Sequence, residues 1–380
     1  MNYIRRIVSL EESLKEKSLF LFGPRQTGKS SYIKHQLKDS VSLVYSLLDQ
    51  ALLLRVLADP SIIRKEIEAR NLSNCVIAID EIQKCPSLLD EIHWLIEERG
   101  IRFLLTGSSA RSLKAKGTNL LGFVYPEIKD TNVSLEQIFM KGLLPPHFLS
   151  QNPEEDIASY VQTYLKEEIA AEGLTRNLPG FSRFLETASC CNTQILNYTN
   201  IASDAQLPRQ TVTQRYQILI DTQQQEGFEV PVYKKTVKRK AIETNKFYFF
   251  DIAPVRFLRK ITHINEQSSE FGEFFEHYIC MELYAWIAYK HPLYELAYWR
   301  TATGVEVDFI VNERLAIEVK STSLVQKKHL KGLQALREEN QMRHYILVCT
   351  EDRPQLIDGI QVLPWKYFLE KLWKDEFEEN

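Results

Sequence analysis

The segment from Gly23 to Ser30 constrains the fold of this chain more than any other feature of its sequence. It reads Gly-Pro-Arg-Gln-Thr-Gly-Lys-Ser and satisfies the pattern G-x-x-x-x-G-K-[ST] in full. The apolar run Ser18–Phe22 precedes it and predicts a β-strand, and Ser30–Leu37 has the pattern of a helix. In this setting glycines turn backbone N–H groups around phosphates, and the helix N-terminus adds partial positive charge. A chance turn with a surface lysine is the alternative, and the strand–loop–helix context argues against it.

Two side chains of this P-loop carry the chemistry of nucleotide binding. Lys29 is expected to neutralise the β- and γ-phosphates of ATP, and the Ser30 hydroxyl to coordinate Mg²⁺. ATP and Mg²⁺ are therefore the predicted cofactors. The residues expected to contact the nucleotide are Gly23, Pro24, Arg25, Gln26, Thr27, Gly28, Lys29, Ser30 and Ser31.

A pair of carboxylates, Asp80 and Glu81, follows the apolar strand Cys75–Ile79. An acid at the end of a neighbouring strand holds magnesium opposite the P-loop serine, the role expected of Asp80. Glu81 is placed to polarise an attacking water. A solvated strand end is the alternative for both. The polar set Thr106–Ser109, after the next strand, could sense the γ-phosphate or form a plain turn.

The first third of the chain alternates short apolar runs with helical patterns, which is typical of a parallel α/β sheet. Further strands are predicted at Val41–Leu48 and Ile101–Leu105, and further helices at Pro60–Ala69 and Ser87–Glu98. The pattern weakens between Thr131 and Leu149. We therefore expect a P-loop ATPase domain over residues 1–150.

Length and composition indicate a globular protein with more than one domain. Its 380 residues suggest two or three domains, and its net charge of −3 gives no overall attraction to nucleic acid or to anionic membranes. No N-terminal segment has the pattern of a signal peptide, and the apolar runs are far shorter than the ~20 residues that cross a bilayer. The six cysteines form no C-x-x-C pair, so we expect buried free thiols in a reducing cytoplasm.

Residues 151–260 are expected to form a helical and winged-helix region. Helical patterns at Ile157–Ile169 and Gly180–Cys190 precede a helix-turn-helix pattern, Ile195–Asp204 and then Pro208–Leu219. The segments Glu229–Val237 and Lys246–Phe250 predict a β-hairpin.

The same region carries polar and basic side chains suited to nucleic acid. On the second helix these are Arg209, Gln210, Thr211, Thr213, Gln214 and Arg215, which could contact phosphates or base edges. In and around the hairpin they are Lys234, Lys235, Lys238, Arg239, Lys240 and Lys246, which could lie on a phosphate backbone. The alternative is a packing or protein-contact module whose lysines are merely solvated.

Residues 261–380 are expected to form a second α/β domain with a site of its own. The strand Val305–Val311 carries Asp308 among apolar residues, and Leu315–Lys320 carries Glu318 and Lys320 on one face, because side chains alternate along a strand. Two carboxylates can hold Mg²⁺, which lowers the pKa of bound water, while a lysine stabilises charge on an attacked phosphate.

The helix predicted at Ser269–Ala288 adds Glu276 as a further candidate metal ligand. The alternative for this region is a structural or binding module in which the acids simply pair with Lys320. A helix at Lys327–Glu338, a strand at Tyr345–Cys349 and a terminal helix complete the predicted domain.

The P-loop spelling, the stretch Ile79–Gln83 with Pro86 and Leu88–Leu89 after it, and the stretch Leu105–Ser109 together resemble one group of prokaryotic AAA-type ATPases. Chains of this group end in a conserved domain of undefined function, DUF4143. The resemblance implies the same roles for the P-loop and strand-end residues as those given above. Gln83 is typical of the family, but the sequence defines no role for it.

The resemblance extends to the other two regions. The family places a helix-turn-helix-like segment in its middle region, followed by a Lys-x-Tyr-Phe-x-Asp motif that Lys246–Asp251 resembles with one residue inserted. Its C-terminal domain shows a G-x-x-x-E helix, then E-V-D-F and I-E-V-K, as this chain does around Glu276, Asp308 and Glu318. That order is similar to the PD-(D/E)xK nuclease fold.

The chain departs from the family at Leu120–Phe123, which reads Leu-Leu-Gly-Phe where members carry Leu-Ala-Gly-Arg. If the missing arginine contacts the γ-phosphate or a neighbouring subunit, hydrolysis here is expected to be slow. Arg111 is the candidate substitute.

The expected fold class is α/β: a P-loop NTPase parallel sheet, a helical and winged-helix middle region, and a restriction-endonuclease-like α/β domain. The leading prediction is an ATPase coupled to nucleic-acid binding or to Mg²⁺-dependent cleavage. One alternative is a nucleotide-dependent binding or regulatory protein whose nuclease-like domain is inactive. Another is a DNA-binding regulator with a vestigial ATPase. DNA or RNA, a protein partner and a second copy of the chain are the candidate partners, and no membrane is.

Overall fold

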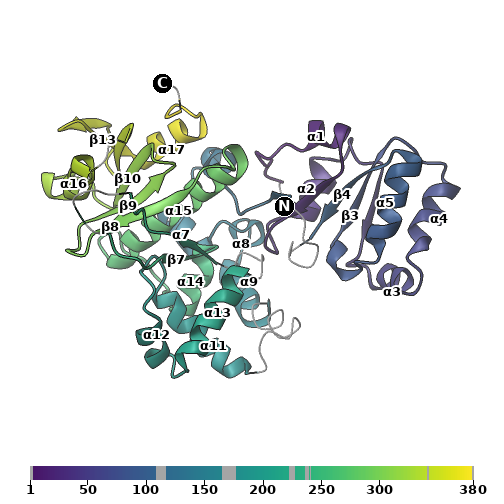
Figure 1. Ribbon diagram of the computed structural model, residues 1–380, viewed down its shortest axis with the longest axis horizontal. Coiled ribbons are helices and arrows are strands. Elements are labelled where there is room, and N and C mark those ends of the chain that lie inside the picture. The colour runs from purple at the N-terminus through teal and green to yellow at the C-terminus, as the bar shows by residue number, and fades with distance from the viewer. Residues whose placement is uncertain are drawn as a thin grey trace. The chain divides into compact units, whose positions relative to one another are not determined.

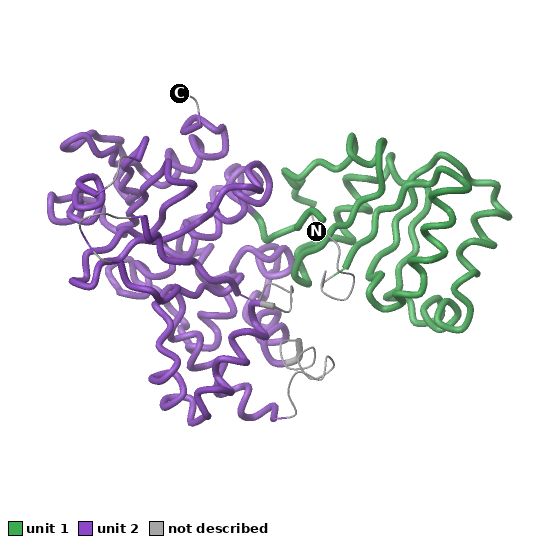
Figure 2. The backbone as a smooth tube through the Cα atoms, in the orientation of Figure 1, with its two compact units in different colours: residues 1–123, 221–225 green, residues 124–220, 226–380 purple. Residues whose placement is uncertain are grey.

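The computed structural model describes residues 3–107, 117–164, 177–221, 227–235, 239, 241–339 and 342–378 (Figure 1). The chain divides into two compact units, one of residues 1–123 with 221–225 and one of residues 124–220 with 226–380 (Figure 2). Within the described ranges, no helix is both long enough and apolar enough to cross a membrane.

The main segment of the first unit ends at Phe123, and the domain limits expected at residues 150 and 260 stay predictions. Residues after Phe123 pack within the second unit: the Tyr125 amide donates a hydrogen bond to Glu282, and the Phe139 ring meets Phe271 at a centroid distance of 5.1 Å. The middle and C-terminal regions belong to this one unit.

The first unit is built on a parallel sheet. Its five described strands have the order β2-β3-β4-β1-β5, and all neighbouring pairs are parallel. The strands are β1 Leu19–Phe22, β2 Leu43–Ser46, β3 Val76–Asp80, β4 Arg102–Thr106 and β5 Thr118–Asn119. The helices are α1 Glu11–Glu16, α2 Lys29–His35, α3 Gln50–Ala58, α4 Ser61–Ala69 and α5 Leu88–Arg99, with the short 3-10 helix η1 Ile82–Lys84. This confirms the predicted α/β class and P-loop-type sheet.

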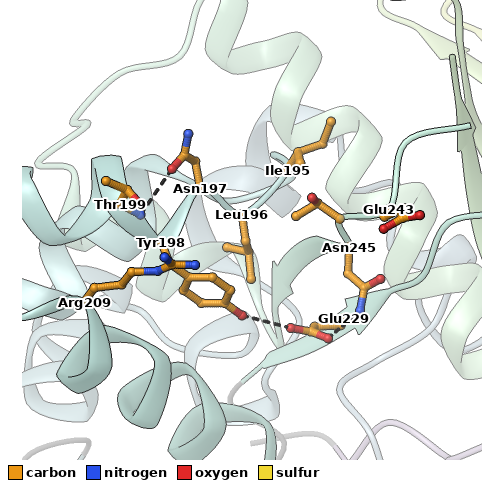
Figure 3. A pocket seen from close by; sticks show the side chains of 10 residues that line it. Ile195, Leu196, Asn197, Tyr198, Thr199, Arg209, Glu229, Glu243 and Asn245 are labelled. Carbon is orange, nitrogen blue, oxygen red and sulfur yellow. Dashed lines mark hydrogen bonds between the residues drawn. The ribbon is translucent and has the colours of Figure 1, made fainter. Parts of the chain in front are cut away.

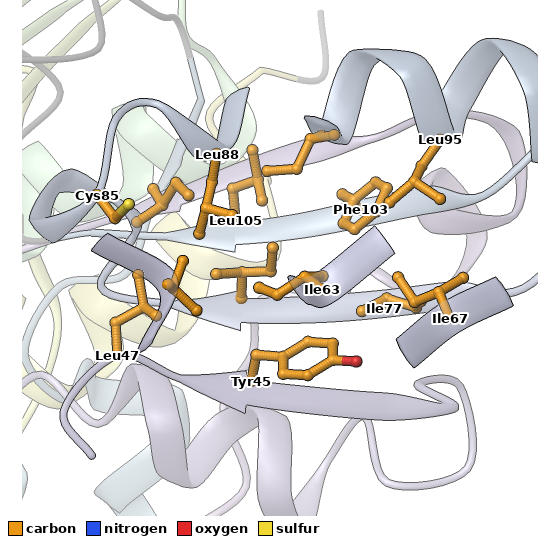
Figure 4. Close-up of a cluster of buried hydrophobic side chains, with 14 of the residues drawn as sticks. Tyr45, Leu47, Ile63, Ile67, Ile77, Cys85, Leu88, Leu95, Phe103 and Leu105 are labelled. Atoms are coloured by element: carbon orange, nitrogen blue, oxygen red, sulfur yellow. The ribbon is translucent and has the colours of Figure 1, made fainter. Parts of the chain in front are cut away.

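One face of this sheet carries a hydrophobic core under α3, α4 and α5 (Figure 4). Ile77 and Phe103 project from the strands, and Ile63, Ile67 and Leu95 meet them from the helices. Buried parallel strands are expected to be apolar along their whole length, as β3 is until its last residue.

Strand register brings the carboxyl ends of three strands together. Leu21 of β1 lies beside Thr106 of β4, and Ile79 of β3 lies beside Leu105 of β4. The loop after β1 and the carboxylates after β3 therefore emerge at the same edge of the sheet, separated by β4.

The second unit begins with helices. They are α6 Tyr125–Ile128, η2 Lys129–Thr131, α7 Leu135–Lys141, α8 Pro145–Phe148, α9 Pro153–Ser159, the π-helix η3 Tyr160–Tyr164, α11 Leu178–Cys190, α12 Tyr198–Asp204, α13 Arg209–Asp221 and α14 Ile252–Leu258. The two-helix pattern predicted at 195–219 is present as α12 and α13. The end of the helix predicted at Ile157–Ile169 lies outside the described residues.

A six-stranded mixed sheet with the order β12-β13-β11-β10-β9-β8 forms the C-terminal part, within the described residues. Its strands are β8 Leu296–Arg300, β9 Glu306–Val311, β10 Leu315–Lys320, β11 His344–Cys349, β12 Gln355–Ile357 and β13 Ile360–Pro364. The helices around it are α15 Ser269–Lys290, η4 Lys327–Leu330, α16 Lys331–Glu339 and α17 Trp365–Trp373.

The predicted β-hairpin is present only as a short two-stranded sheet, β6 Gly227–Val230 with β7 Lys246–Phe249. The described part of the connection between them runs along β8 instead of forming a free wing. Val232 bridges Tyr298, and Ala241 bridges Thr301. A winged helix therefore stays a prediction.

Candidate functional site

The P-loop occupies the turn between β1 and α2, as predicted. Gly23 has φ of 145°, and a Cβ atom there would lie 2.1 Å from the Leu120 carbonyl oxygen. Gly28 has φ of 89° at the start of α2. Both positions need glycine, the first because the backbone of another segment approaches it closely and the second because of its left-handed conformation.

The lysine and the serine of the motif contact different groups: the lysine contacts its own loop, and the serine contacts a carboxylate. Lys29 is 5% exposed, and its Nζ donates to the carbonyl oxygens of Gly23 (2.8 Å) and Pro24 (3.0 Å), so the amino group is folded back into its own loop. The exposed Ser30 donates from Oγ to Oδ2 of Asp80 at 2.7 Å.

The remaining predicted contact residues lie along the same turn. Thr27 is buried and donates from its hydroxyl to the Pro24 carbonyl at 2.8 Å. Arg25 is half-buried, whereas Gln26, with φ of 62°, and Ser31 are exposed. Their roles in nucleotide binding stay predictions.

Asp80 and Glu81 are both buried, at 2% and 7% exposure. The Thr106 hydroxyl links them: it donates to Asp80 Oδ1 and accepts from the Glu81 amide at 3.2 Å. The sequence suggests Thr106 as a possible phosphate sensor; in this structure its hydroxyl contacts the Asp80 carboxylate and the backbone amide of Glu81. Ser108, Ser109 and Arg111 lie outside the described residues.

Gln83, which the sequence left without a role, holds the Glu81 side chain. Its Nε2 donates to Oε2 of Glu81 at 2.5 Å. Glu81 itself has a left-handed backbone, with φ of 64°. The signal that could have found this contact is the i, i+2 spacing across a tight turn immediately after a strand.

Arg6 is a further residue that sequence reasoning missed. It is 3% exposed, and its guanidinium donates to the carbonyl oxygens of Thr27 (2.7 Å), Leu121 (2.6 Å) and Gly122 (2.9 Å). It also lies 5.1 Å from the centre of the Phe123 ring. Arg6 thus joins the P-loop to the segment where the family arginine is missing.

The donor groups at this edge of the sheet fit Mg²⁺ and a nucleotide. A hydroxyl and a carboxylate, Ser30 and Asp80, are already in contact across β4, and oxygen atoms are the ligands that Mg²⁺ prefers. Lys29 supplies a buried positive charge within the loop.

The acids predicted in the C-terminal region do come together. Lys320 Nζ lies 2.6 Å from Glu318 Oε1 and 3.6 Å from Asp308 Oδ2. Asp308 also accepts a hydrogen bond from the Val319 amide at 2.8 Å. Lys320 therefore pairs with both strand carboxylates.

A second lysine, Lys246, enters the same cluster from β7. Its Nζ lies 3.0 Å from Glu276 Oε1, 2.5 Å from Glu306 Oε1 and 3.9 Å from Asp308 Oδ1. We call these six residues, Glu276, Glu306, Asp308, Glu318, Lys246 and Lys320, the lysine–acid cluster. Glu306 and Lys246 were not predicted to belong here.

Burial and charge shift the pKa values of this cluster. Burial raises the pKa of Glu318 to about 8, and Asp308 adds to the rise while Lys320 opposes it. Burial also raises the pKa of Glu276, with Lys246 opposing. Burial opposes the charge on Lys246, but the carboxylates of Glu276, Asp308 and Glu306 outweigh it and raise the pKa of the lysine.

The basic residues predicted to contact nucleic acid are largely engaged elsewhere. Lys235 pairs with Glu313, Arg239 with Glu338 and Glu339, and Lys246 lies in the lysine–acid cluster. On α13, Arg215 is 4% exposed and donates to the Gly180 carbonyl at 2.7 Å. Lys238 and Lys240 lie outside the described residues.

A cavity of about 520 Å³ opens beside the start of α13 (Figure 3). Arg209, Tyr198, Asn245 and Glu229 line it, and Glu229 accepts hydrogen bonds from Asn245 (2.7 Å) and Tyr198 (3.5 Å). The cavity thus combines a guanidinium, an aromatic ring and a carboxylate.

Three family models match successive parts of the chain. Residues 15–129 match a model described as an AAA domain, residues 132–265 match the domain of unknown function DUF8612, and residues 271–368 match the domain of unknown function DUF4143. No curated protein matches the chain. The chain therefore carries an AAA domain of the nucleotide-binding, ATPase-like kind, followed at its C-terminal end by a DUF4143 domain.

Proposed function

We propose that this protein binds ATP with Mg²⁺ at the P-loop, hydrolyses it, and uses the nucleotide state to regulate a C-terminal domain that cuts nothing. The observation that carries the ATPase proposal is the hydrogen bond of 2.7 Å between Ser30 and Asp80. It brings the P-loop hydroxyl and the strand-end carboxylate together at one edge of the sheet, which is the arrangement that magnesium–nucleotide binding needs.

Each residue of the site has a proposed task. Lys29 would exchange its two loop carbonyls for phosphate oxygens, and Ser30 and Asp80 would hold Mg²⁺ directly or through water. When bound, the metal neutralises charge on the β- and γ-phosphates. Glu81, held by Gln83, would orient a water and accept its proton.

Substitution of Lys29 and Glu81 tests this proposal. Lys29→Ala should weaken ATP binding roughly 10- to 100-fold, because a charge-assisted hydrogen bond to phosphate is lost. Glu81→Gln should keep ATP binding and slow turnover about 10²- to 10⁴-fold, because the general base is lost. Binding of a fluorescent ATP analogue and release of inorganic phosphate measure the two effects.

Lys34→Ala is the matched control, since Lys34 is an exposed lysine on the same helix, α2. It should behave as the unchanged protein does in both assays. Wild-type phosphate release by both Lys29→Ala and Glu81→Gln would rule out the proposed site.

The lysine–acid cluster supports the regulatory proposal for the C-terminal domain over the cleaving one. Lys320 and Lys246 pair with all four carboxylates of the cluster. No group of three or more His, Cys, Asp or Glu residues in the described ranges is arranged to hold a metal ion. Because the two lysines already neutralise the carboxylates that would hold a divalent ion, the PD-(D/E)xK chemistry is not part of the proposed function.

Contact with single-stranded nucleic acid is a second candidate function, and the cavity beside α13 favours it. Arg209 is exposed at the start of this helix, where a guanidinium can pair with a phosphate. Tyr198 supplies a ring on which a base can stack, and Glu229 can accept hydrogen bonds from base amino groups.

Arg209→Ala should weaken binding of mixed-sequence single-stranded DNA or RNA and reduce the log–log salt slope by about 0.7, because one phosphate contact is lost. Lys235→Ala should change neither quantity, because this lysine is already paired with Glu313. Titration at several salt concentrations measures both. Equal affinity and slope for Arg209→Ala and the unchanged protein would contradict this second function.

In the same samples, with Mg²⁺ or Mn²⁺ added, the substrates should remain uncut. Cleavage that Asp308→Ala abolishes would contradict the regulatory proposal.

A further inference from the structure

We propose that the ammonium group of Lys246 occupies the position among Glu276, Glu306 and Asp308 that a divalent cation would otherwise hold. The lysine–acid cluster is then a metal-free site with a cation supplied by the chain itself. The inference rests on the proposed non-cleaving role of the C-terminal domain, and it is independent of ATP hydrolysis.

The geometry around Lys246 is that of a coordinated cation. Three carboxylates from two elements surround its Nζ, at 3.0 Å (Glu276 on α15), 2.5 Å (Glu306 on β9) and 3.9 Å (Asp308 on β9). The side chain of Lys246 is only 5% exposed. The centre of the Tyr298 ring lies 5.3 Å from Nζ, so the ring covers another side of the ammonium group.

The backbone holds this lysine in place from both sides. Lys246 is the first residue of β7, where it pairs with Val230 of β6. It also forms a bridge with Ile195. The ammonium group is therefore delivered by a strand that is hydrogen-bonded on both edges, and it is not the mobile end of a surface side chain.

The acids are oriented toward the ammonium by other contacts. Glu276 also accepts a hydrogen bond of 2.7 Å from the Tyr248 hydroxyl, and Tyr248 lies on β7 with Lys246. Arg300 holds the second oxygen of Glu306 at 2.8 Å. These partners fix both carboxylates without a metal ion.

Charge balance explains why a divalent ion and Lys246 exclude each other. Lys246, Lys320 and Arg300 already place three positive charges beside the four carboxylates, and a divalent cation within a few ångströms of a buried ammonium would be strongly repelled. Glu318 Oε2 is buried and has no hydrogen-bond partner among the described residues. Removal of the Lys246 charge would leave the facing oxygens of Glu276, Glu306 and Asp308 available to an oxygen-seeking ion.

The test counts Mn²⁺ ions bound by nucleotide-free, chelator-treated protein, with electron paramagnetic resonance or calorimetry as the readout. Lys246→Met, which keeps the length of the side chain without its charge, should raise the number of bound ions by about one per chain. Adding Glu276→Gln to this variant should remove the extra ion. Any binding at the P-loop is common to all samples and cancels in the comparison.

Lys235→Met is the matched control, because it removes one lysine from the same segment outside the cluster. It should bind as many ions as the unchanged protein. The proposal is overturned if folded Lys246→Met, checked by near-ultraviolet circular dichroism, gains no Mn²⁺.

A comparison that needs no Lys246 variant guards against misfolding. The unchanged protein and Glu276→Gln should bind equal numbers of Mn²⁺ ions. Loss of an ion in Glu276→Gln would show that the cluster already holds a metal and would overturn the proposal. Failure of the ATPase tests would leave both results unaffected.

Discussion

Arg6 carries out a task at the P-loop that no motif describes. The buried guanidinium binds one carbonyl of the P-loop and two carbonyls that lie more than a hundred residues after Arg6 in the chain. Because these bonds occupy the guanidinium, Arg6 does not replace the family arginine whose position Phe123 takes. We infer that Arg6 positions the loop. The slow hydrolysis expected from the missing arginine stays a prediction.

Substitution of Arg6 should therefore weaken nucleotide binding without removing any nucleotide contact. Arg6→Gln leaves buried carbonyl oxygens without donors, a loss of one to two kcal/mol in loop positioning, which corresponds to about 5- to 30-fold weaker ATP binding. Titration with a fluorescent ATP analogue measures the change.

Arg5→Gln is the control for this prediction, because Arg5 is the exposed neighbour and carries the same charge. It should bind ATP with unchanged affinity. If Arg6→Gln also binds ATP as tightly as the unchanged protein does, Arg6 serves only the packing of the N-terminal segment.

At the residue scale, the sequence predicts contacts that a motif encodes and misses those that only the fold creates. The proximity of Ser30 to Asp80 follows from two strand-end motifs of one parallel sheet. The contacts of Arg6 and Lys246 join residues far apart in the chain. No motif around either residue indicates which residue it contacts. An isolated basic residue is usually exposed, so from the sequence Lys246 is interpreted as part of a nucleic-acid surface, and Arg6 is given no role.

At the element scale, the buried strands were predictable and the exposed elements were not. Strands β1, β3 and β4 are apolar runs between turn signals, and the prediction placed each within one or two residues. Helix α3 was missed because its leucines point in all directions: Leu54 and Leu57 are 65% and 53% exposed. The edge strand β12 is three residues long and largely exposed, too short for an alternating pattern.

Helix α13 shows how helical periodicity limits the nucleic-acid interpretation. Val212, Tyr216 and Leu219 are buried on one face of this helix, at spacings of four and three residues. Arg215 lies three residues after Val212 and four before Leu219, so it must face the same interior. The nucleic-acid prediction counted Arg215 although it lies on this buried face. Arg209, in contrast, begins the helix and is exposed.

At the scale of the whole second unit, Glu282 connects its first and last parts. One carboxylate oxygen accepts from the Tyr125 amide at 2.7 Å, and the other accepts from Trp373 Nε1 at 2.7 Å. Glu282 lies on α15, the longest helix of the described chain, and is 1% exposed. This contact helps explain why the residues after Phe123 belong with the C-terminal part and not with the parallel sheet of the first unit.

The same burial makes the stability of this unit sensitive to pH. Burial raises the pKa of Glu282 to about 8, from 4.5 in an exposed glutamate, while its hydrogen bonds from Trp373 and Tyr125 oppose the rise. The folded protein therefore binds a proton that the unfolded chain releases between these two values. Stability from this group is fully present below pH 4.5, declines as the pH rises, and is lost above pH 8.

Comparison with Glu282→Gln isolates this effect. The amide cannot ionise, but it offers one acceptor oxygen in place of two, so the variant should be less stable at pH 5 by about 1–3 kcal/mol. As the pH rises from 5 to 8, the unchanged protein should lose up to about 1.4 kcal/mol of stability per pH unit relative to the variant, so the stability gap should shrink or reverse.

Urea unfolding followed by tryptophan fluorescence at each pH measures this effect. The signal reports on the second unit, because four of the five tryptophans lie in it: Trp286, Trp299, Trp365 and Trp373. A stability gap that stays constant from pH 5 to 8 would mean that Glu282 has the same charge in the folded and unfolded chain, and that its two hydrogen bonds alone join the ends of the unit.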